Sequence, residues 1–504
     1  MFYNKFKNLA ASVMLVLAAG ACTDGFDELN TSPTLITDDK VAPQMLFTYV
    51  VKNSVFASFS PGRIHEFSGY YGNEATGNIL AHSDYTSPFN NYRSYIINLK
   101  EIIRLTADDP TKVDQNAIAR IFLVWNYHSM TDAYGDIPYH EAALGVENAV
   151  NQPKYDTQEE IYRHMLAELK DAAGVLGSQP NQVSFGNADL IYQGDVEKWR
   201  KFANSLRLRL ANRVRFVAPS LAQEHIVDAL TQPLITENAD NASLETMAAA
   251  SDVSNNNVNP IWLRYFVNNG TKYYAGMPVT DIMVPTNDPR LPLFADPIES
   301  DGVTFRGRPI QLLQDQKEEY PSEGTSGLGP LLYAPTYDII VFNAAETHFL
   351  RAEAALAGIT AEDENAMFRK GIELSMEQYE IDATAAATFL GQPVATLSGT
   401  EEEQLEQIIT QKYVAIFFQA TEGWAEFRRT GYPRIWVGAE LGVTNGNIPR
   451  RLTYPNDEYL KNEQNVEAAV ARLSGGDELM SRVWWDVRPN LPLEHPMKGA
   501  FPPN

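Results

Sequence analysis

The chain has 504 residues, of which 44% are hydrophobic and 11% aromatic, so it can form a large packed core and does not have the composition of a disordered protein. Its formal net charge of −24 argues against a nucleic-acid partner, because such a surface repels a phosphate backbone. For the same reason an uncharged ligand is more favourable than an anionic polymer.

Residues 1–21 follow the three-part plan of a secretory signal peptide. Two lysines, Lys5 and Lys7, precede an apolar run over residues 9–19, which ends on small residues. This run is too short to span a bilayer as a helix. No later stretch has about 18 consecutive apolar residues, so the rest of the sequence predicts no membrane span.

Cys22, the only cysteine of the chain, follows directly. A run of small residues that ends on a lone cysteine resembles a bacterial lipoprotein signal, in which the cysteine is lipidated and becomes the mature N-terminus. The fit is imperfect, because the third residue before it is Ala19, where such signals prefer leucine. The alternative is a buried or incidental cysteine behind an ordinary cleavage site. A lipidated Cys22 leaves the mature chain without a disulfide and anchors it to a membrane.

Residues 22–40 predict a flexible tether, which carries Asp24, Asp27 and Glu28 close behind Cys22. In lipoproteins of the Bacteroidetes type, acidic residues at this place look like a signal for export to the outer cell surface. On physical grounds alone the same run is a solvated linker. The resemblance therefore implies a lipid-anchored protein of the outer membrane that is exposed at the cell surface.

The following segments alternate between helix and loop. Residues 41–59 are apolar with few helix breakers, which predicts a helix, whereas residues 63–91 predict a long loop rich in aromatic residues and glycine. The helix after residues 108–110 carries His128 on its apolar face. We interpret His128 as a core histidine with its hydrogen bonds satisfied, in preference to a ligand-binding residue.

A sharp turn ends that helix, because Gly135 can adopt a positive φ and Pro138 cannot continue a helix. Two acids of this turn, Asp132 and Asp136, could suggest a metal site or a catalytic pair. We prefer the interpretation that both accept hydrogen bonds from backbone donors in a buried corner.

Helix signals dominate residues 157–213. Thr157 and Glu160 have the spacing of a capping box, and Trp199 begins an apolar stripe with a helical period. Six basic residues lie between Lys198 and Arg213. In so acidic a chain, these cations predict ion pairs with carboxylates on neighbouring helices.

The composition changes over residues 233–335, where prolines, glycines and asparagines become frequent. Loops this long in a compact protein are usually either functional or disordered, and the aromatic residues among them argue against disorder. Regular helices return at residues 343–357, which end at Gly358, and at residues 365–379. The two helices form a hairpin of the length of one tetratricopeptide unit. Thr400 and Glu403 cap a further helix.

Several segments together resemble one family. These segments are residues 122–139, 199–213, 343–358, 408–429, 449–455 and 484–486. Together with Cys22, the chain resembles the SusD/RagB-type outer-membrane lipoproteins of Bacteroidetes, in the SusD-like branch often labelled starch-binding. The resemblance implies a mostly α fold with one domain over residues 22–504, built as a scaffold of tetratricopeptide-like helical hairpins with long irregular loops.

The resemblance also implies a function. Members of this family are typically surface lipoproteins that bind an oligosaccharide and deliver it to a SusC-like TonB-dependent outer-membrane transporter, over which they sit as a lid, and the resemblance implies the same for this chain. The alternatives are a surface-tethered peptide-binding lipoprotein, a tethered glycoside hydrolase with a close carboxylate pair, and a purely structural lipoprotein. The matched segments belong mostly to the scaffold, so they transfer no binding site.

The sequence contains no recognisable catalytic pattern. It has neither a zinc-binding His-Glu-x-x-His nor a phosphate-binding glycine loop, and residues 324–327 lack the spacing of a nucleophile elbow. The asparagine run after Asp252 fails as a calcium loop, because its last ligand position holds Leu263. We therefore predict a binding protein with no cofactor and no metal centre, and leave open whether it binds a structural calcium.

Two loop segments, residues 70–92 and 255–274, combine the side chains that recognise a sugar. Aromatic rings cover the apolar face of a sugar, and the planar heads of asparagine and arginine bridge its hydroxyl groups. The alternative is that these aromatic residues only pin their loops to the core. The predicted ligand-binding residues are Tyr70, Tyr71, Asn73, Trp262, Arg264, Tyr265 and Tyr273.

Overall fold

A computed structural model of the chain describes residues 40–73, 88–145, 148–247, 257–267, 273–310, 312, 316–435, 443–491 and 493. The chain divides into two compact units, Met1–Pro43 and Gln44–Asn504. Cys22 and nearly all of the predicted signal peptide and tether lie outside the described residues, so these assignments stay predictions. The features below belong to the second unit, in which α3 lies from its second residue onward.

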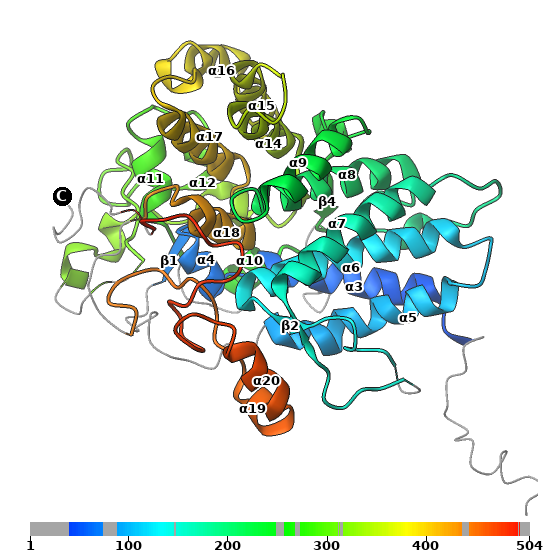
Figure 1. The fold of residues 1–504 in the computed structure, drawn as a ribbon. Coiled ribbons are helices and arrows are strands. Elements are labelled where there is room, and N and C mark those ends of the chain that lie inside the picture. Colours follow the sequence, from blue (N-terminus) through cyan, green and yellow to red (C-terminus); the bar gives the residue numbers. More distant parts are fainter. Residues whose placement is uncertain are drawn as a thin grey trace, which may run out of the picture. The chain divides into compact units, whose positions relative to one another are not determined.

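The second unit is mostly helical, as predicted (Figure 1). The helices of the first half are α3 (Pro43–Phe59), α4 (Arg63–Phe67), α5 (Ile97–Thr106), α6 (Val113–Tyr134), α7 (Gln158–Val175), α8 (Val196–Arg213) and α9 (Pro219–Leu230). Short helices follow in the proline-rich region: α10 (Pro260–Trp262), α11 (Met277–Met283), α12 (Leu291–Phe294) and α13 (Pro330–Tyr333). The last group is α14 (Ala344–Leu356), α15 (Glu364–Gln378), α16 (Ala383–Leu390), α17 (Glu401–Ala415), α18 (Ala420–Thr430), α19 (Asn456–Lys461) and α20 (Glu463–Val470).

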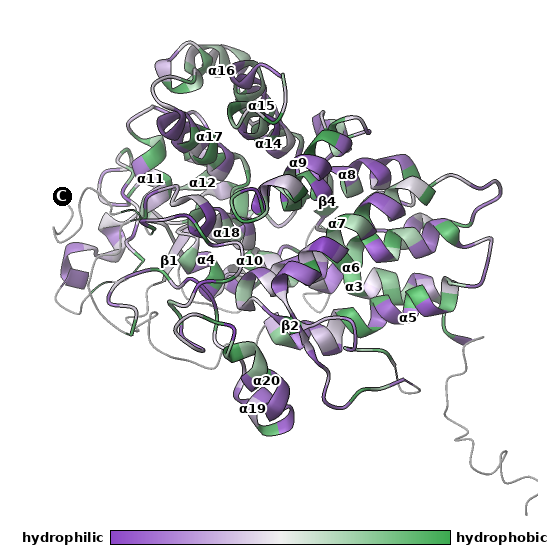
Figure 2. Ribbon diagram, in the orientation of Figure 1, coloured by the Kyte–Doolittle hydropathy of each residue, from purple (hydrophilic) through white to green (hydrophobic). Residues whose placement is uncertain are grey.

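Helices that follow one another in the chain pack against one another. This holds from α5 through α9 and again for α14 with α15, and it produces the predicted tetratricopeptide-like hairpins (Figure 1). Hydrophobic and hydrophilic residues are interleaved along these helices, as expected for elements that bury only part of their surface (Figure 2). Helix α14 also contacts α8 and α17, so the two groups of hairpins share an interface.

Local capping signals fix several helix starts. Thr157 before α7 and Thr400 before α17 each form a complete capping box with the glutamate three residues later, as predicted. Asn343 caps α14 by accepting from the main-chain nitrogen of Glu346. Gly358, just after α14, has a φ of 68°, which is the left-handed conformation expected behind a helix end.

The described strands form three two-stranded antiparallel sheets. These are β1 (Tyr71–Asn73) with β5 (Tyr273–Ala275), β2 (Ile137–Pro138) with β3 (Tyr155–Asp156), and β4 (Ala242–Glu245) with β6 (Asp338–Phe342). The first pairing joins the two loop segments predicted to bind ligand, with Asn73 opposite Tyr273. A region predicted as one long loop therefore contains α4 and a strand.

The predicted apolar stripe of α8 is confirmed as core. Trp199 is fully buried, and its indole Nε1 donates to Asp189 Oδ2 over 2.6 Å. Its ring lies 5.5 to 6.3 Å, centroid to centroid, from the rings of four other aromatic residues, Phe47, Phe122, Tyr192 and Phe202. The predicted ion pairs of α8 are also present, for example between Arg207 and Asp228 of α9 at 2.7 Å.

A fully buried ionic network, which we call the core ion network, joins α8 to α14, α17 and α18. Arg209 donates from Nε and Nη2 to the two carboxylate oxygens of Glu346, at 2.7 and 2.5 Å. Arg213 contacts Glu422 at 2.5 Å and Glu426 at 2.8 Å. Lys412 of α17 completes the network with a 2.9 Å contact to Glu422. Each charge is paired, which is what a charge needs in order to be tolerated in a protein interior.

The turn after α6 is only partly as predicted. Asp136 does accept a backbone hydrogen bond, from the nitrogen of Gln158 at 2.8 Å. For Asp132 the described residues show no such bond: its carboxylate accepts from the side chains of Tyr162 and Trp485 and lies 3.6 Å from Arg213. The interpretation of Asp132 as a backbone acceptor is wrong, because its donors are the side chains of Tyr162 and Trp485, which lie far from it in the sequence.

Candidate functional site

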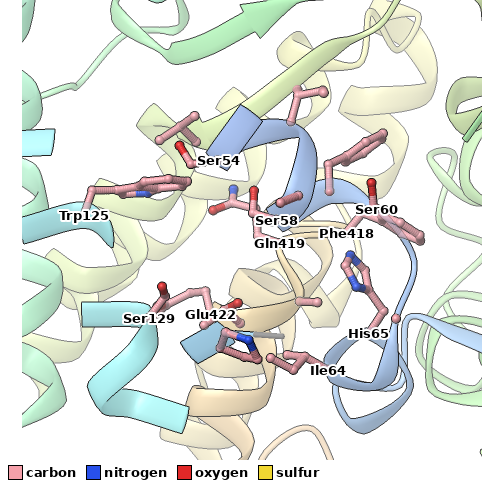
Figure 3. A pocket seen from close by; sticks show the side chains of 18 of the residues that line it. Ser54, Ser58, Ser60, Ile64, His65, Trp125, Ser129, Phe418, Gln419 and Glu422 are labelled. Carbon is pink, nitrogen blue, oxygen red and sulfur yellow. The ribbon is translucent and has the colours of Figure 1, made fainter. Parts of the chain in front are cut away.

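A pocket of about 320 Å³ opens in the second unit between segments that are far apart in the sequence. Its walls come from the end of α3, from α4, from the middle of α6, from β6 and from residues 417–422, which lead into α18. In Figure 3, Trp125 of α6 lies across the opening from His65 and Phe418, with Gln419 between them. A pocket of this size is at the lower end of the range for small-molecule sites.

Aromatic side chains form much of the apolar wall. Trp125 is partly exposed, and its indole stacks on Phe122 of the preceding turn at a centroid distance of 5.0 Å and an angle of 13°. Tyr337 stacks on Phe59 at 5.1 Å, and Phe418 packs 4.8 Å from the imidazole of His65. A rigid indole supported from behind offers an apolar face to a ligand at little entropic cost.

Two buried histidines also line the pocket and remain uncharged. Burial lowers the pKa of His65 to about 3 and that of His128 to about 4. Both side chains are only 4% exposed. His128 is therefore a core histidine, as predicted, but it is not satisfied, because its Nδ1 atom has no hydrogen-bond partner among the described residues.

Four polar atoms of residues that line the pocket, His128 Nδ1 among them, are buried without a hydrogen-bond partner in the described chain. They are Ser54 Oγ, His65 Nε2, His128 Nδ1 and Gln419 Nε2. Leaving such a group unpaired costs about 1–3 kcal/mol, so a cluster of them is unusual in a protein core. All four groups belong to uncharged side chains, and a ligand or water reaches these atoms only when neighbouring side chains move, because the atoms have almost no accessible surface.

Charged residues form the floor of the pocket but are engaged with one another. Arg209 and Glu422 both line it and both belong to the core ion network. Although burial alone would raise the pKa of Glu422, Arg213 and Lys412 hold it well below its usual range. The carboxylate is thus ionised and unsuited to act as a general acid.

The described residues contain no group of three or more histidine, cysteine, aspartate or glutamate side chains arranged to hold a metal ion. Among the described helices, none combines the length and the hydropathy that a transmembrane span requires.

The structure buries both predicted ligand-binding tyrosines of the first segment. Tyr70 is fully buried, stacks on Tyr413 at 4.4 Å and donates from its hydroxyl to the carbonyl of Tyr413 at 2.9 Å. Tyr71 is 2% exposed, and its hydroxyl donates to Glu66 at 3.3 Å. Both side chains thus pin their loop to the core. Of Asn73, the structure gives the backbone in β1.

The second predicted segment is more open. Tyr273 is buried, whereas Trp262 and Tyr265 are partly exposed and Arg264 is exposed. The Arg264 guanidinium lies 5.7 Å from the ring centre of Tyr273, and Tyr265 packs 4.7 Å from Tyr333. These contacts group the residues at one place next to the β1–β5 sheet. Ligand contact by the predicted residues stays a prediction, and the exposed members of this segment now carry it.

Sequence reasoning missed the pocket residues Ser54, Trp125 and Gln419. Ser54 does carry a weak signal, because it is a polar residue within the apolar helix predicted over residues 41–59. The other two lie in helical patterns that predict only scaffold. Nothing local in the sequence indicates that these positions meet around one cavity.

The chain is similar to known proteins over most of its length. A family described as "Starch-binding associating with outer membrane" matches residues 42–455. The comparison with curated proteins gave no match. A solved structure of a chitin-binding protein shares 27% sequence identity, covers 89% of this chain and 100% of its own, and superimposes with a TM-score of 0.78.

Two further solved structures are similar in the same way. A chitin-binding SusD homolog from Flavobacterium johnsoniae is 26% identical, with 88% of this chain and 98% of that chain covered and a TM-score of 0.72. A SusD homolog from Bacteroides ovatus is 28% identical, with the same coverage and a TM-score of 0.72.

Proposed function

The chain belongs to the SusD-like family of starch-binding proteins that associate with the outer membrane, and on this basis we propose that it captures an oligosaccharide at the cell surface and passes it to a SusC-like TonB-dependent transporter. The pocket between α3, α6 and α18 is its candidate ligand site. In this proposal the protein binds its ligand without converting it, and a lipid on Cys22 holds it at the outer membrane.

One observation carries the proposal, namely that the pocket combines an indole wall with several uncharged polar groups that have no protein partner in the described chain. A sugar ring has the complementary surface, because it offers an apolar C–H face and a rim of hydroxyl groups, each of which both donates and accepts. Two of the similar structures are those of chitin-binding proteins, which supports the same ligand class.

The loop residues Trp262, Arg264 and Tyr265 remain part of the proposal. Trp262 and Tyr265 are partly exposed and Arg264 is exposed; Trp262 is the last residue of α10, and the other two lie within three residues after it. A longer oligosaccharide would contact more surface than the pocket offers, and this aromatic segment is the second place to look for such contacts.

Isothermal titration calorimetry of the full-length protein in mild detergent tests the proposal. The ligands are maltohexaose, chitohexaose and a mixture of short peptides. We expect one of the two oligosaccharides to bind and the peptides not to bind. Trp125→Ala should weaken binding at least tenfold, because it removes the indole wall. Glu224→Ala, at an exposed position of α9, is the matched control and should bind like the parent.

Chromatography of the oligosaccharides after incubation completes the test. Unchanged ligands are expected from a binding protein. Binding of peptides alone would replace the glycan by a peptide ligand, and the appearance of shorter oligosaccharides would make the protein a hydrolase.

A further inference from the structure

We propose that the pocket selects the uncharged part of a glycan and that it binds a ligand oxygen at the first turn of α18, beside Gln419. The inference rests on the proposed function and adds to it a ligand class and a specificity-determining residue.

The buried charged residues of the wall, Arg209 and Glu422, are already paired with other protein charges. Arg209 is clamped by Glu346 with two contacts of 2.7 and 2.5 Å. The two oxygens of Glu422 are taken by Lys412 at 2.9 Å and by Arg213 at 2.5 Å. All of these side chains are at most 4% exposed, so water does not screen the pairs and neither partner is available to an entering ion.

Arg63, His65 and His128 are further ionisable residues of the described wall. Arg63 pairs with Glu66 at 3.1 Å, but its side chain is 43% exposed, so water screens its charge. His65 and His128 are held neutral by burial, which lowers the pKa of each far below the usual value. An anionic sugar would therefore lose its hydration without gaining a buried cation in return, which is unfavourable in a partly enclosed site.

The first turn of α18 supplies donors instead of charge. The N–H groups at a helix start have no partner within the helix, and Gln419, at the capping position, makes no capping bond with its side chain. In the described chain the main-chain nitrogens of Thr421 and Glu422 have no acceptor. Both residues line the pocket. A ligand oxygen at this place would satisfy donors that the protein leaves open.

The orientation of Gln419 adds a further donor. Its Oε1 atom accepts from Arg209 Nη2 at 3.3 Å, and because a guanidinium can only donate, the oxygen must be the atom that faces it. The amide nitrogen then lies on the other side, where it is buried and has no partner. Arg209, fixed by Glu346, is thus the positioning residue for the Gln419 amide.

A helix start that opens into a pocket commonly attracts an anion, but α18 already carries its own. Glu422 is the third residue of the helix, is 4% exposed and stays ionised. Its carboxylate opposes any second negative charge near the first turn. A hydroxyl or an amide oxygen brings no charge, so it gains the open donors without this repulsion. The oxygen expected beside Gln419 is therefore that of a sugar hydroxyl or an acetamido carbonyl.

The test uses calorimetry of the full-length protein in mild detergent with maltohexaose and chitohexaose as uncharged probes and oligogalacturonate as the acidic probe. At least one uncharged probe should bind ten times more tightly than oligogalacturonate. Gln419→Glu should weaken that binding at least tenfold, because it keeps the oxygen that faces Arg209 and replaces the donor by a charged acceptor. Gln223→Glu adds the same charge on the exposed side of α9 and should stay within twofold of the parent.

Circular dichroism and thermal melts show whether the variants fold. Should Gln419→Glu fail to fold, Gln419→Met decides, since it removes the amide without adding charge and should weaken binding at least threefold. Equal affinity of the parent and of the folded Gln419 variants would overturn the role of Gln419. Equal or tighter binding of oligogalacturonate would overturn the ligand class while leaving glycan binding intact. A parent protein that binds none of the three probes would instead remove the proposed function itself.

Discussion

Replacing Trp199 with alanine should strongly destabilise the protein and leave the affinity of the folded molecules unchanged. The side chain is fully buried in α8 and touches aromatic residues of three other segments, so its removal leaves a cavity that they cannot close. Cavities of this kind cost about 3–5 kcal/mol. Trp199 does not line the pocket, which is why binding should persist.

A second loss adds to the cavity. The carboxylate of Asp189 is buried and accepts from Trp199 Nε1 and from the main-chain nitrogens of Ile191, Tyr192 and Gly194. Burial raises the pKa of Asp189, although these donors oppose the change. Removing one donor to a buried charge costs about 1.5–3 kcal/mol. The two losses share a site and do not add fully, so we expect about 5 kcal/mol in total.

Denaturant unfolding followed by tryptophan-independent circular dichroism measures this loss. Trp199→Phe separates the two causes, because it keeps most of the ring and removes the N–H donor, and should cost about 1.5–3 kcal/mol. Glu224→Ala, on the exposed side of α9, should change the free energy of unfolding by less than about 0.5 kcal/mol. A Trp199→Ala protein that unfolds like the parent would mean that the α8 stripe is not core and that the scaffold described here is wrong.

Cys22→Ala should release the protein from the outer-membrane pellet on fractionation, since Cys22 is the only candidate anchor, and retention in cells that lack the transporter would refute lipidation. Mild-detergent pull-downs should recover a large TonB-dependent barrel, and repeated recovery of the protein alone would speak against delivery to a transporter. The free energy of unfolding should fall as pH drops below about 6.5, because His65 and His128 take up a proton there in the unfolded chain but stay neutral in the folded protein. Each histidine should contribute a loss of about 1.4 kcal/mol per pH unit, until the pH reaches its folded pKa of about 3 for His65 or about 4 for His128. Melts from pH 7 to pH 5 measure this loss, which the double variant His65→Gln/His128→Gln should reduce. Alanine variants of Trp262 and Tyr265 should weaken calorimetric binding of a long oligosaccharide, and two folded variants that bind like the parent would remove this segment from the site.

Local signals predicted the scaffold well. The capping box of Thr157 with Glu160 depends only on residues three positions apart, and the structure contains it. The ion pairs of α8 followed from charge balance, because cations in an acidic chain find carboxylates wherever the helix is buried. Asp132 was misjudged because its donors, Tyr162 and Trp485, come from segments that no local pattern connects to it.

The candidate site could not be predicted in the same way. An aromatic residue in a loop can point outward or pin the loop, and the sequence does not distinguish the two; Tyr70 pins its loop to Tyr413, some 340 positions further along the chain. Ser54, Trp125 and Gln419 meet only because the helical hairpins fold back on one another. A site built from single residues of distant scaffold elements leaves no motif in the sequence.

The core ion network also restricts how this sequence can change over evolutionary time. Its members are shared, so that Glu422 pairs with both Arg213 and Lys412, and Arg213 also contacts Glu426. Loss of one member strands a buried charge, which typically costs about 3–5 kcal/mol, whereas joint replacement by apolar residues can be neutral. A single substitution in the network therefore strongly lowers the stability of the protein, and substitutions that preserve stability must come as paired changes on different helices. Among descendants, we expect Arg213 and Glu422 to be kept or lost together, while the unshared ion pairs at the surface of the hairpins drift freely.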